Sequence, residues 1–165
     1  PADRLVAYLD PEEFSSFWLG GKAIYRTRMA IADGGELIIL APGVSTFGED
    51  PEIDRLIRKY GYRSNNVTRQ QVAENEDYQQ TLGAAAQVML CSPEERFRIT
   101  LCPGGLTREE VQNAGLGYGE LSEYMERYPP GKLTDGWNTL ADGERIYFVR
   151  KPALGLWALE SRIPQ

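Results

Sequence analysis

The chain has 165 residues, 42% of them hydrophobic and 25% charged, so it has the length and composition of one globular domain and not of a disordered segment. Its 18 basic and 24 acidic residues give a net charge of −6, which repels phosphate backbones and anionic membrane surfaces, so we expect no nucleic-acid partner and no membrane partner. The longest apolar run, from Leu37 to Pro42, is far shorter than the ~20 residues that cross a bilayer.

The residue types that are absent or rare exclude several kinds of catalytic and metal site. There is no histidine, which excludes a Ser-His-Asp triad, a Cys-His pair and imidazole metal sites within this chain. Cys91 and Cys102 are too few for a disulfide framework or a four-thiolate zinc site, and we expect free, partly buried thiols whose pairing stays open. No secretion or lipidation motif is visible, so we expect a cytoplasmic protein. The chain begins at Pro1 and not at a methionine, which is typical of a fragment or a processed product.

The first quarter of the chain predicts a strand, two helices and a second strand. Residues 4–9 have the composition of a short strand, and Asp10-Pro11 is a helix-start signal followed by apolar residues at helical spacing. A second helix is expected over residues 22–32, ended by Asp33-Gly34-Gly35. Residues 36–41 form a continuous apolar run, which is typical of a central parallel strand covered on both faces.

The rest of the chain continues this alternation of strands and helices. We expect helices over residues 50–61, 68–76, 77–91, 107–114 and one ending near 128, strands over 96–101 and 144–150, and a last short element over 152–159. Asn66 and Thr68 are candidate caps, and Leu82, Ala85, Ala86, Met89 and Leu90 are expected to face inward. The pattern predicts one α/β domain over residues 1–165, a three-layer sandwich in which helices flank a largely parallel or mixed central sheet.

Two glycine-rich loops leave alternatives open. The loop Gly115-Leu116-Gly117-Tyr118-Gly119 lacks the G-x-G-x-x-G spacing of a dinucleotide loop, and no clear strand precedes it, so a loop and capping role is favoured over phosphate binding. The loop Pro103-Gly104-Gly105 precedes a helix start at Thr107, where its amides could face an anion. A plain strand-to-helix turn is favoured there.

The segment from Phe17 to Arg28 groups aromatic, glycine and basic residues around one expected helix start. Its glycine pair would let a ligand or another backbone approach closely. Lys22 would lie in the first helical turn, where the helix dipole disfavours a cation, and a residue placed against its local preference indicates another role. Together with the helix amides it could hold a carboxylate. A kinked helix with solvated basic residues explains the same composition equally well.

The same segment carries a resemblance to a known family. Residues 17–43, FWLGGKAIYRTRMAIADGGELIILAPG, closely resemble the C-terminal domain of the nickel-dependent lactate racemase family. The shorter stretches at residues 47–50, 103–105 and 152–158 look like the same subfamily. The resemblance covers nearly the whole chain, but only the stretch from Lys22 to Gly43 is specific.

The resemblance implies a two-domain isomerase, of which this chain would be the C-terminal domain. The N-terminal domain would carry the histidines and a lysine tethered to a nickel-pincer nucleotide, so we expect no cofactor, metal ligand or catalytic residue on this chain alone. The C-terminal domain would close over a 2-hydroxy acid in the cleft between the domains. The implied reaction is racemisation or epimerisation by reversible hydride transfer through a 2-keto acid. The isolated chain is expected to be inactive.

The resemblance also implies a set of substrate-binding residues. Lys22 matches the lysine that binds the substrate carboxylate in the family, and Leu19 stands where the lactate enzymes have a glutamine. This departure favours a sugar acid or another extended hydroxy acid over lactate. The full predicted set is Trp18, Leu19, Lys22, Tyr25, Arg26, Arg28 and Tyr78. The alternative is a binding or interaction module that keeps the fold without the chemistry.

Overall fold

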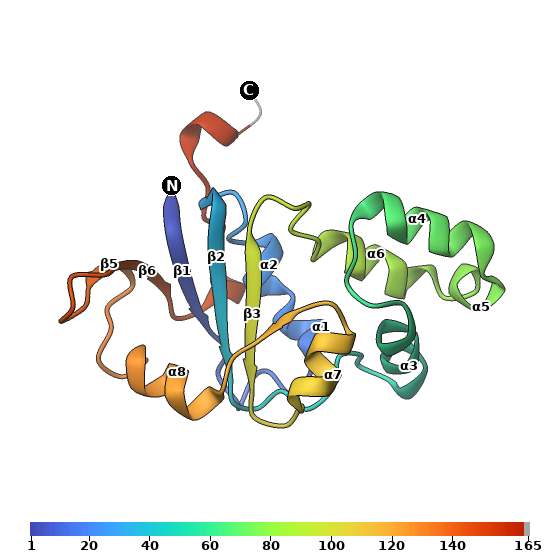
Figure 1. Ribbon diagram of the computed structural model, residues 1–165, viewed down its shortest axis with the longest axis horizontal. Helices are drawn as coiled ribbons and strands as arrows, with labels where there is room; N and C mark the ends of the chain where they lie inside the picture. The colour runs from blue at the N-terminus through green and yellow to red at the C-terminus, as the bar shows by residue number, and fades with distance from the viewer. Residues whose placement is uncertain (164–165) are drawn as a thin grey trace.

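The computed structural model describes residues 1–163 and shows one central sheet with helices on both faces (Figure 1). The strands are β1 (Ala2–Tyr8), β2 (Ile31–Ala41), β3 (Arg98–Pro103), β4 (Gly117–Tyr118), β5 (Gly136–Thr139) and β6 (Arg145–Val149). The helices are α1 (Phe17–Gly20), α2 (Lys22–Tyr25), α3 (Pro51–Tyr60), α4 (Asn65–Glu74), α5 (Glu76–Gln79), α6 (Leu82–Leu90), α7 (Arg108–Asn113) and α8 (Leu121–Arg127). Two short 3-10 helices follow, η1 (Pro152–Leu154) and η2 (Glu160–Arg162).

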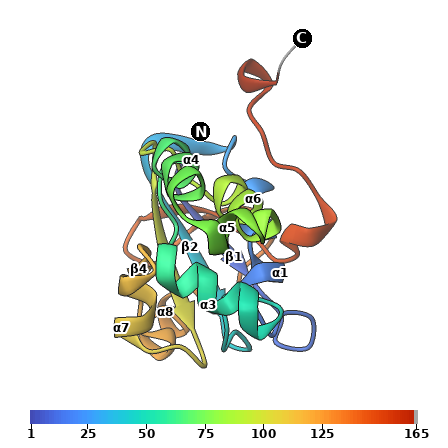
Figure 2. The same cartoon turned by 90° about the vertical axis from the view of Figure 1, so that its right-hand side faces the viewer.

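The strands lie in the order β4-β3-β2-β1-β6-β5. All neighbouring pairs are parallel except β5 and β6, which pair antiparallel at one edge. Figure 2 shows α3, α4, α5 and α6 together on one side, while the chain after η1 runs separately to the C-terminus. The predicted α/β sandwich with a largely parallel sheet is therefore confirmed.

The core follows the alternation of side chains along the strands. In β2, Leu37 and Ile39 lie on the face that packs against α1, α2, α3, α6 and α7, whereas Ile38 and Leu40 lie on the face covered by α8. All four side chains are almost completely buried. Because both faces are covered, a continuous apolar run is the correct pattern for this strand, and the prediction for residues 36–41 is confirmed.

Two helix predictions in the first quarter are wrong. Residues 11–13 form only a turn, in which the Asp10 carboxylate accepts a hydrogen bond from the Glu12 N–H at 2.9 Å, and helical structure begins at Phe17. The helix predicted over residues 22–32 ends at Tyr25, and β2 begins at Ile31, which pairs with Ala2. The glycine pair predicted to stop a helix instead lies inside β2. There Gly34 adopts φ +79° where the register with β1 shifts.

Later predictions miss one helix break and two strands. The helix predicted over residues 77–91 is divided into α5 and α6 at Thr81, and Ser64, not Asn66 or Thr68, caps α4. Leu82 and Leu90, predicted to face inward, are 59% and 48% exposed, and Ala86 is exposed as well. The short strands β4 and β5 have too few apolar residues to be recognised by alternation.

Within residues 1–163, no helix is long and apolar enough to cross a membrane.

Candidate functional site

Five of the seven predicted site residues share the outward face of α1 and α2. The inward face of these two helices is formed by Phe17, Gly20, Ala23 and Ile24, which are all buried. The outward residues are Trp18, Leu19, Lys22, Tyr25 and Arg26, and each is half-buried. We call these five residues the α1–α2 face. Two aromatic rings and two cations therefore lie together on one half-buried surface.

The backbone at Lys22 differs from the sequence-based expectation. Ser16 caps α1, and Gly21 has helical dihedral angles of φ −54° and ψ −22°, with its N–H donating to the Phe17 carbonyl at 2.8 Å. The helical path therefore runs on from α1 into α2. Lys22 starts α2 but lies more than one turn after Ser16, so the argument that the helix dipole disfavours it there does not apply. The Gly21 amide is occupied and cannot bind a carboxylate.

Helix α6 supports α1 and α2 on one flank. The Gln87 amide donates from Nε2 to the Trp18 carbonyl at 2.8 Å. A Cβ on Gly21 would come within 2.6 Å of Gln87 Nε2 and 2.7 Å of Cys91 Sγ. The glycine predicted to permit close approach therefore does so, but for α6 and not for a ligand. Arg28 donates to the Leu90 carbonyl at 3.3 Å, which makes it part of the same support.

Arg26 carries an unmet hydrogen-bonding requirement. Its Nε is buried and has no partner among the described residues, and its guanidinium lies 5.9 Å from the Tyr25 ring centre. A guanidinium nitrogen can only donate, so a buried one without an acceptor is costly. Burial and the neighbouring Cys91 raise the pKa of Tyr25, against an opposing effect of Arg26, so the phenol stays neutral. Within residues 1–163, neither Lys22 nor Arg26 forms an ion pair.

Tyr78 is placed apart from the α1–α2 face. It is fully buried in a cluster with Leu56, Tyr60 and Ala84, and its ring stacks on Tyr60 at 4.3 Å between ring centres. Burial raises its pKa to about 12, and its hydroxyl has no partner among the described residues. The structure thus gives Tyr78 a packing role between α3, α5 and α6.

The described residues hold no obvious metal centre. They contain no group of three or more histidine, cysteine, aspartate or glutamate side chains that could bind a metal ion. Cys91 and Cys102 are free, as predicted, but fully buried where partial burial was expected, and burial raises the pKa of each thiol to about 12. They belong to the cores on opposite faces of the sheet. Neither thiol is therefore available as a ligand or nucleophile.

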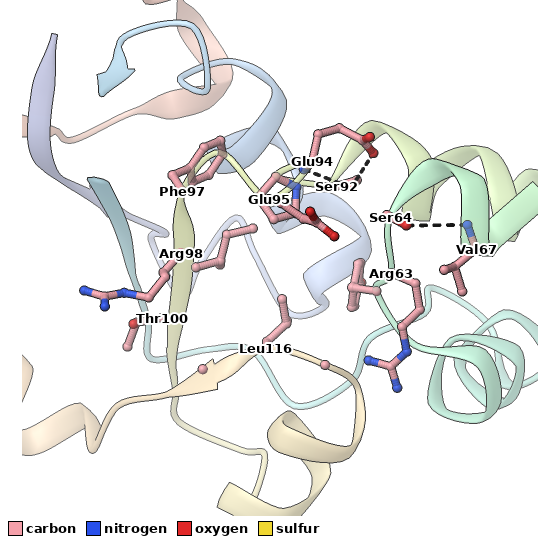
Figure 3. Close-up of a pocket in the computed structure, with 15 residues that line it drawn as sticks. Arg63, Ser64, Val67, Ser92, Glu94, Glu95, Phe97, Arg98, Thr100 and Leu116 are labelled. Carbon is pink, nitrogen blue, oxygen red and sulfur yellow. Dashed lines mark hydrogen bonds between the residues drawn. The ribbon is translucent and has the colours of Figure 1, made fainter. Parts of the chain in front are cut away.

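A pocket of about 490 Å³ lies away from the predicted residues, between the start of α4 and the amino-terminal part of β3 (Figure 3). Phe97 and Leu116 line its apolar part, and Arg98 lies at its rim. The turn beside it holds Glu94 and Glu95 at φ 49° and 61°, a conformation that is uncommon for residues other than glycine. One oxygen of the Glu94 carboxylate is occupied, because Oε1 accepts from the Asn65 N–H at 2.8 Å and from the Ser92 hydroxyl at 2.7 Å. Gly115, Leu116 and Gly117, from the glycine-rich loop for which phosphate binding is the alternative, also line this pocket.

A smaller hollow of about 100 Å³ lies at the carboxyl ends of β1 and β6, where the strand order reverses. Ligands of open α/β sheets often bind at such a point. Tyr8, Asp10, Glu13, Arg150 and Lys151 contribute to its lining. The Arg150 guanidinium is already committed to the carbonyls of Pro130 and Leu133, at 2.7 and 2.6 Å. The hollow is thus mainly a structural junction.

Comparison with known proteins places the fold. No known family and no curated protein matches the sequence. Among solved structures, a Thermotoga maritima protein matches with a TM-score of 0.76 and 22% identity over 97% of this chain and 37% of its own. The lactate racemase apoprotein from Thermoanaerobacterium thermosaccharolyticum matches with a TM-score of 0.61 and 15% identity over 97% of this chain and 36% of its own. The chain therefore has a lactate racemase-like fold and spans little more than a third of these two proteins.

Proposed function

We propose that this chain is the substrate-closing domain of a nickel-pincer-dependent 2-hydroxy acid racemase or epimerase. The observation that carries the proposal is the α1–α2 face, where two cations without carboxylate partners stand beside two aromatic rings. The fold supports the proposal, because almost the whole chain is similar in structure to part of a lactate racemase. The resemblance of residues 17–43 adds a sequence reason for assigning the carboxylate to Lys22.

The role of this domain in the reaction is binding and orientation. The Lys22 ammonium binds the substrate carboxylate, and Arg26 supplies a second donor from the same face. Hydrogen bonds between charged groups are shorter and stronger than neutral ones, and holding both ends of a small acid fixes which carbon faces the reacting group. Trp18 and Tyr25 flank the cations and restrict access of water. Leu19 cannot make the hydrogen bonds of the glutamine found in the lactate enzymes, which argues against lactate, and the Arg26 guanidinium favours a longer, more polar hydroxy acid such as a sugar acid.

The nickel cofactor belongs, in this proposal, to another domain of the same protein. The residues of this chain do not fit it, because the sequence has no histidine and the described part contains no cluster of metal-binding side chains. When bound, the cofactor would accept and return the hydride from C2. Every contribution of this chain is then made through substrate binding, and the chain alone is inactive.

Substitution of Lys22 tests the proposal in the full-length, nickel-loaded protein. Proton NMR in heavy water against a panel of 2-hydroxy acids should show inversion at C2 with the original hydrogen retained. Lys22→Ala should lower kcat/KM roughly 10- to 150-fold, which corresponds to the ~1.5–3 kcal/mol of a hydrogen bond to a charged group. Lys22→Arg should recover part of the activity. Lys132→Ala, which removes an exposed lysine elsewhere, should leave kcat/KM unchanged.

Several results would contradict the proposal. Normal turnover by Lys22→Ala would remove this residue from the site. Incorporation of deuterium at C2 would indicate deprotonation and exclude hydride transfer. A folded, nickel-loaded protein that inverts no acid in the panel would favour the alternative, a binding or interaction module that keeps the fold.

A further inference from the structure

One face of β5 and β6 has hollows that no α-helix within residues 1–163 lines. Trp137 on β5 and Tyr147 on β6 are paired across the two strands and lie on the face opposite α8, with their rings edge-to-face at 5.4 Å between centres. The segment after β6 passes over this face, and Pro1 and Ala2 lie at its border. Two adjoining hollows of about 450 and 240 Å³ lie there, and both are lined by Tyr147 and Trp157.

We call these two hollows, with Trp137, Tyr147, Leu154, Leu156 and Trp157, the C-terminal groove. It exposes large apolar side chains to an unusual degree. Leu154 is 79% exposed, Leu156 is 65% exposed and Trp137 is 49% exposed. Single exposed apolar residues are ordinary, but a contiguous group beside a hollow usually indicates an interaction surface.

Positive charges border the C-terminal groove. The Arg145 guanidinium lies over the Trp137 ring at 4.6 Å from its centre, and Lys151 lines the larger hollow and is exposed. Asp135 lines the same hollow and accepts a hydrogen bond from the Arg150 N–H at 2.7 Å. A partner that covers this groove should therefore present apolar side chains bordered by carboxylates.

The position of the first described residues indicates the partner. Pro1 and Ala2 line the smaller hollow together with Leu156 and Leu159, so any residues that precede Pro1 enter the protein at this groove. The two structural neighbours match this chain over only 37% and 36% of their own length. A further domain joined directly before Pro1 would thus start beside the exposed side chains.

The groove also adjoins the candidate site. The Trp157 N–H donates to the Arg26 carbonyl at 2.8 Å, and α2 packs against η1, which holds Leu154. We propose that the C-terminal groove is the surface on which the preceding domain of the same protein docks, placing that domain beside the α1–α2 face. This inference rests on the proposed function, because it identifies the missing domain as the partner.

Hydroxyl-radical footprinting of the full-length protein tests this docking surface. Leu82 on α6 is 59% exposed and provides a matched control of the same residue type. If the groove is open, Leu154 and Leu156 should be labelled faster than Leu82, as their exposure requires. If the preceding domain covers it, both should be labelled more slowly than Leu82 at every protein concentration. Labelling at or above the rate of Leu82 would overturn the proposal, and so would protection that appears only as protein concentration rises, which indicates a second copy.

A double variant separates this proposal from the proposed function. Leu154→Asp with Leu156→Asp in the full-length protein should expose Trp137 and Trp157 to labelling and increase the radius of gyration in X-ray scattering, whereas Leu82→Asp should do neither. Unchanged scattering and labelling in the double variant would contradict docking. The Lys22→Ala protein should keep the protected groove whether or not it is active, so the two proposals can fail independently.

Discussion

Two groups of cations in this protein differ in whether carboxylates bind them. On α3, Arg58 binds Asp54 at 2.6 Å and Glu110 at 2.8 Å, and Lys59 binds Asp77 at 2.8 Å. On the α1–α2 face, Lys22 and Arg26 have no such partner within residues 1–163. The chain is acidic overall, so carboxylates are not scarce.

This difference separates stability from function. The carboxylates and cations of the α3 region satisfy one another and hold neighbouring loops, so their removal should destabilise the fold. We expect the cations of the α1–α2 face to contribute little to folding and to be available to a ligand. We expect stability measurements to respond to the first group and activity measurements to the second.

The largest effect should come from Asp54. One oxygen of its carboxylate accepts from the N–H groups of Phe47 and Gly48 at 2.7 and 2.9 Å, while the other binds Arg58. Asp54→Ala leaves these donors unsatisfied and should lower the free energy of unfolding by ~2–4 kcal/mol, measured by urea denaturation of the 165-residue chain. Asp33→Ala, which removes exposed ion pairs with Arg96 and Arg162, should cost less than ~1 kcal/mol. Equal losses would contradict the distinction between the two regions.

The same carboxylates should make stability fall in acid. Burial alone would raise the pKa of Asp54, but the N–H groups of Gly48 and Phe47 and the Arg58 guanidinium outweigh it and lower the pKa. Hydrogen bonds from Thr107 and Arg58 likewise lower the pKa of Glu110. A carboxyl group whose pKa is lower in the folded state than in the unfolded state stabilises the protein at pH values above the unfolded-state pKa. That pKa is ~3.9 for aspartate and ~4.3 for glutamate.

This contribution is lost as the pH falls through the folded-state pKa values. Urea midpoints should therefore be level between about pH 5 and 7 and decrease progressively below about pH 4. In Asp54→Asn the acid-induced decrease should be smaller, because one of the titrating groups is gone. An equally steep decrease in that variant would show that other carboxylates dominate the acid response.

The sequence predicts well what depends on local pattern. The strand at residues 36–41 and the capped helix that begins after Asp50 follow directly from apolar runs and caps. It fails where tertiary contacts decide. The register of β2 against β1 draws residues 31–35 into a strand, although Asp33-Gly34-Gly35 has the composition of a helix end.

The candidate site shows the same division. The family resemblance named the residues from Trp18 to Arg26, and the helical conformation of Gly21, which the sequence did not predict, places them on one face. No sequence pattern could show that Tyr78 stacks on Tyr60, because that contact depends on how α3 and α5 pack. The C-terminal groove was missed for a related reason, since its parts come from β5, β6 and the last segment.

The smallest loss of stability should come from substitution of Arg26. This substitution tests most directly whether the cations of the α1–α2 face differ from those of α3. Its buried Nε has no acceptor in the described structure, so removing the guanidinium sacrifices no ion pair and relieves an unsatisfied donor. Arg26→Met keeps the aliphatic part of the side chain near Tyr25, and it should not lower the free energy of unfolding. Arg58→Met, the matched change on α3, should cost ~1–3 kcal/mol, because it removes the cation that binds both Asp54 and Glu110. Urea denaturation of both variants decides the matter: a loss in Arg26→Met as large as in Arg58→Met would mean that Arg26 is structural and not free for a ligand.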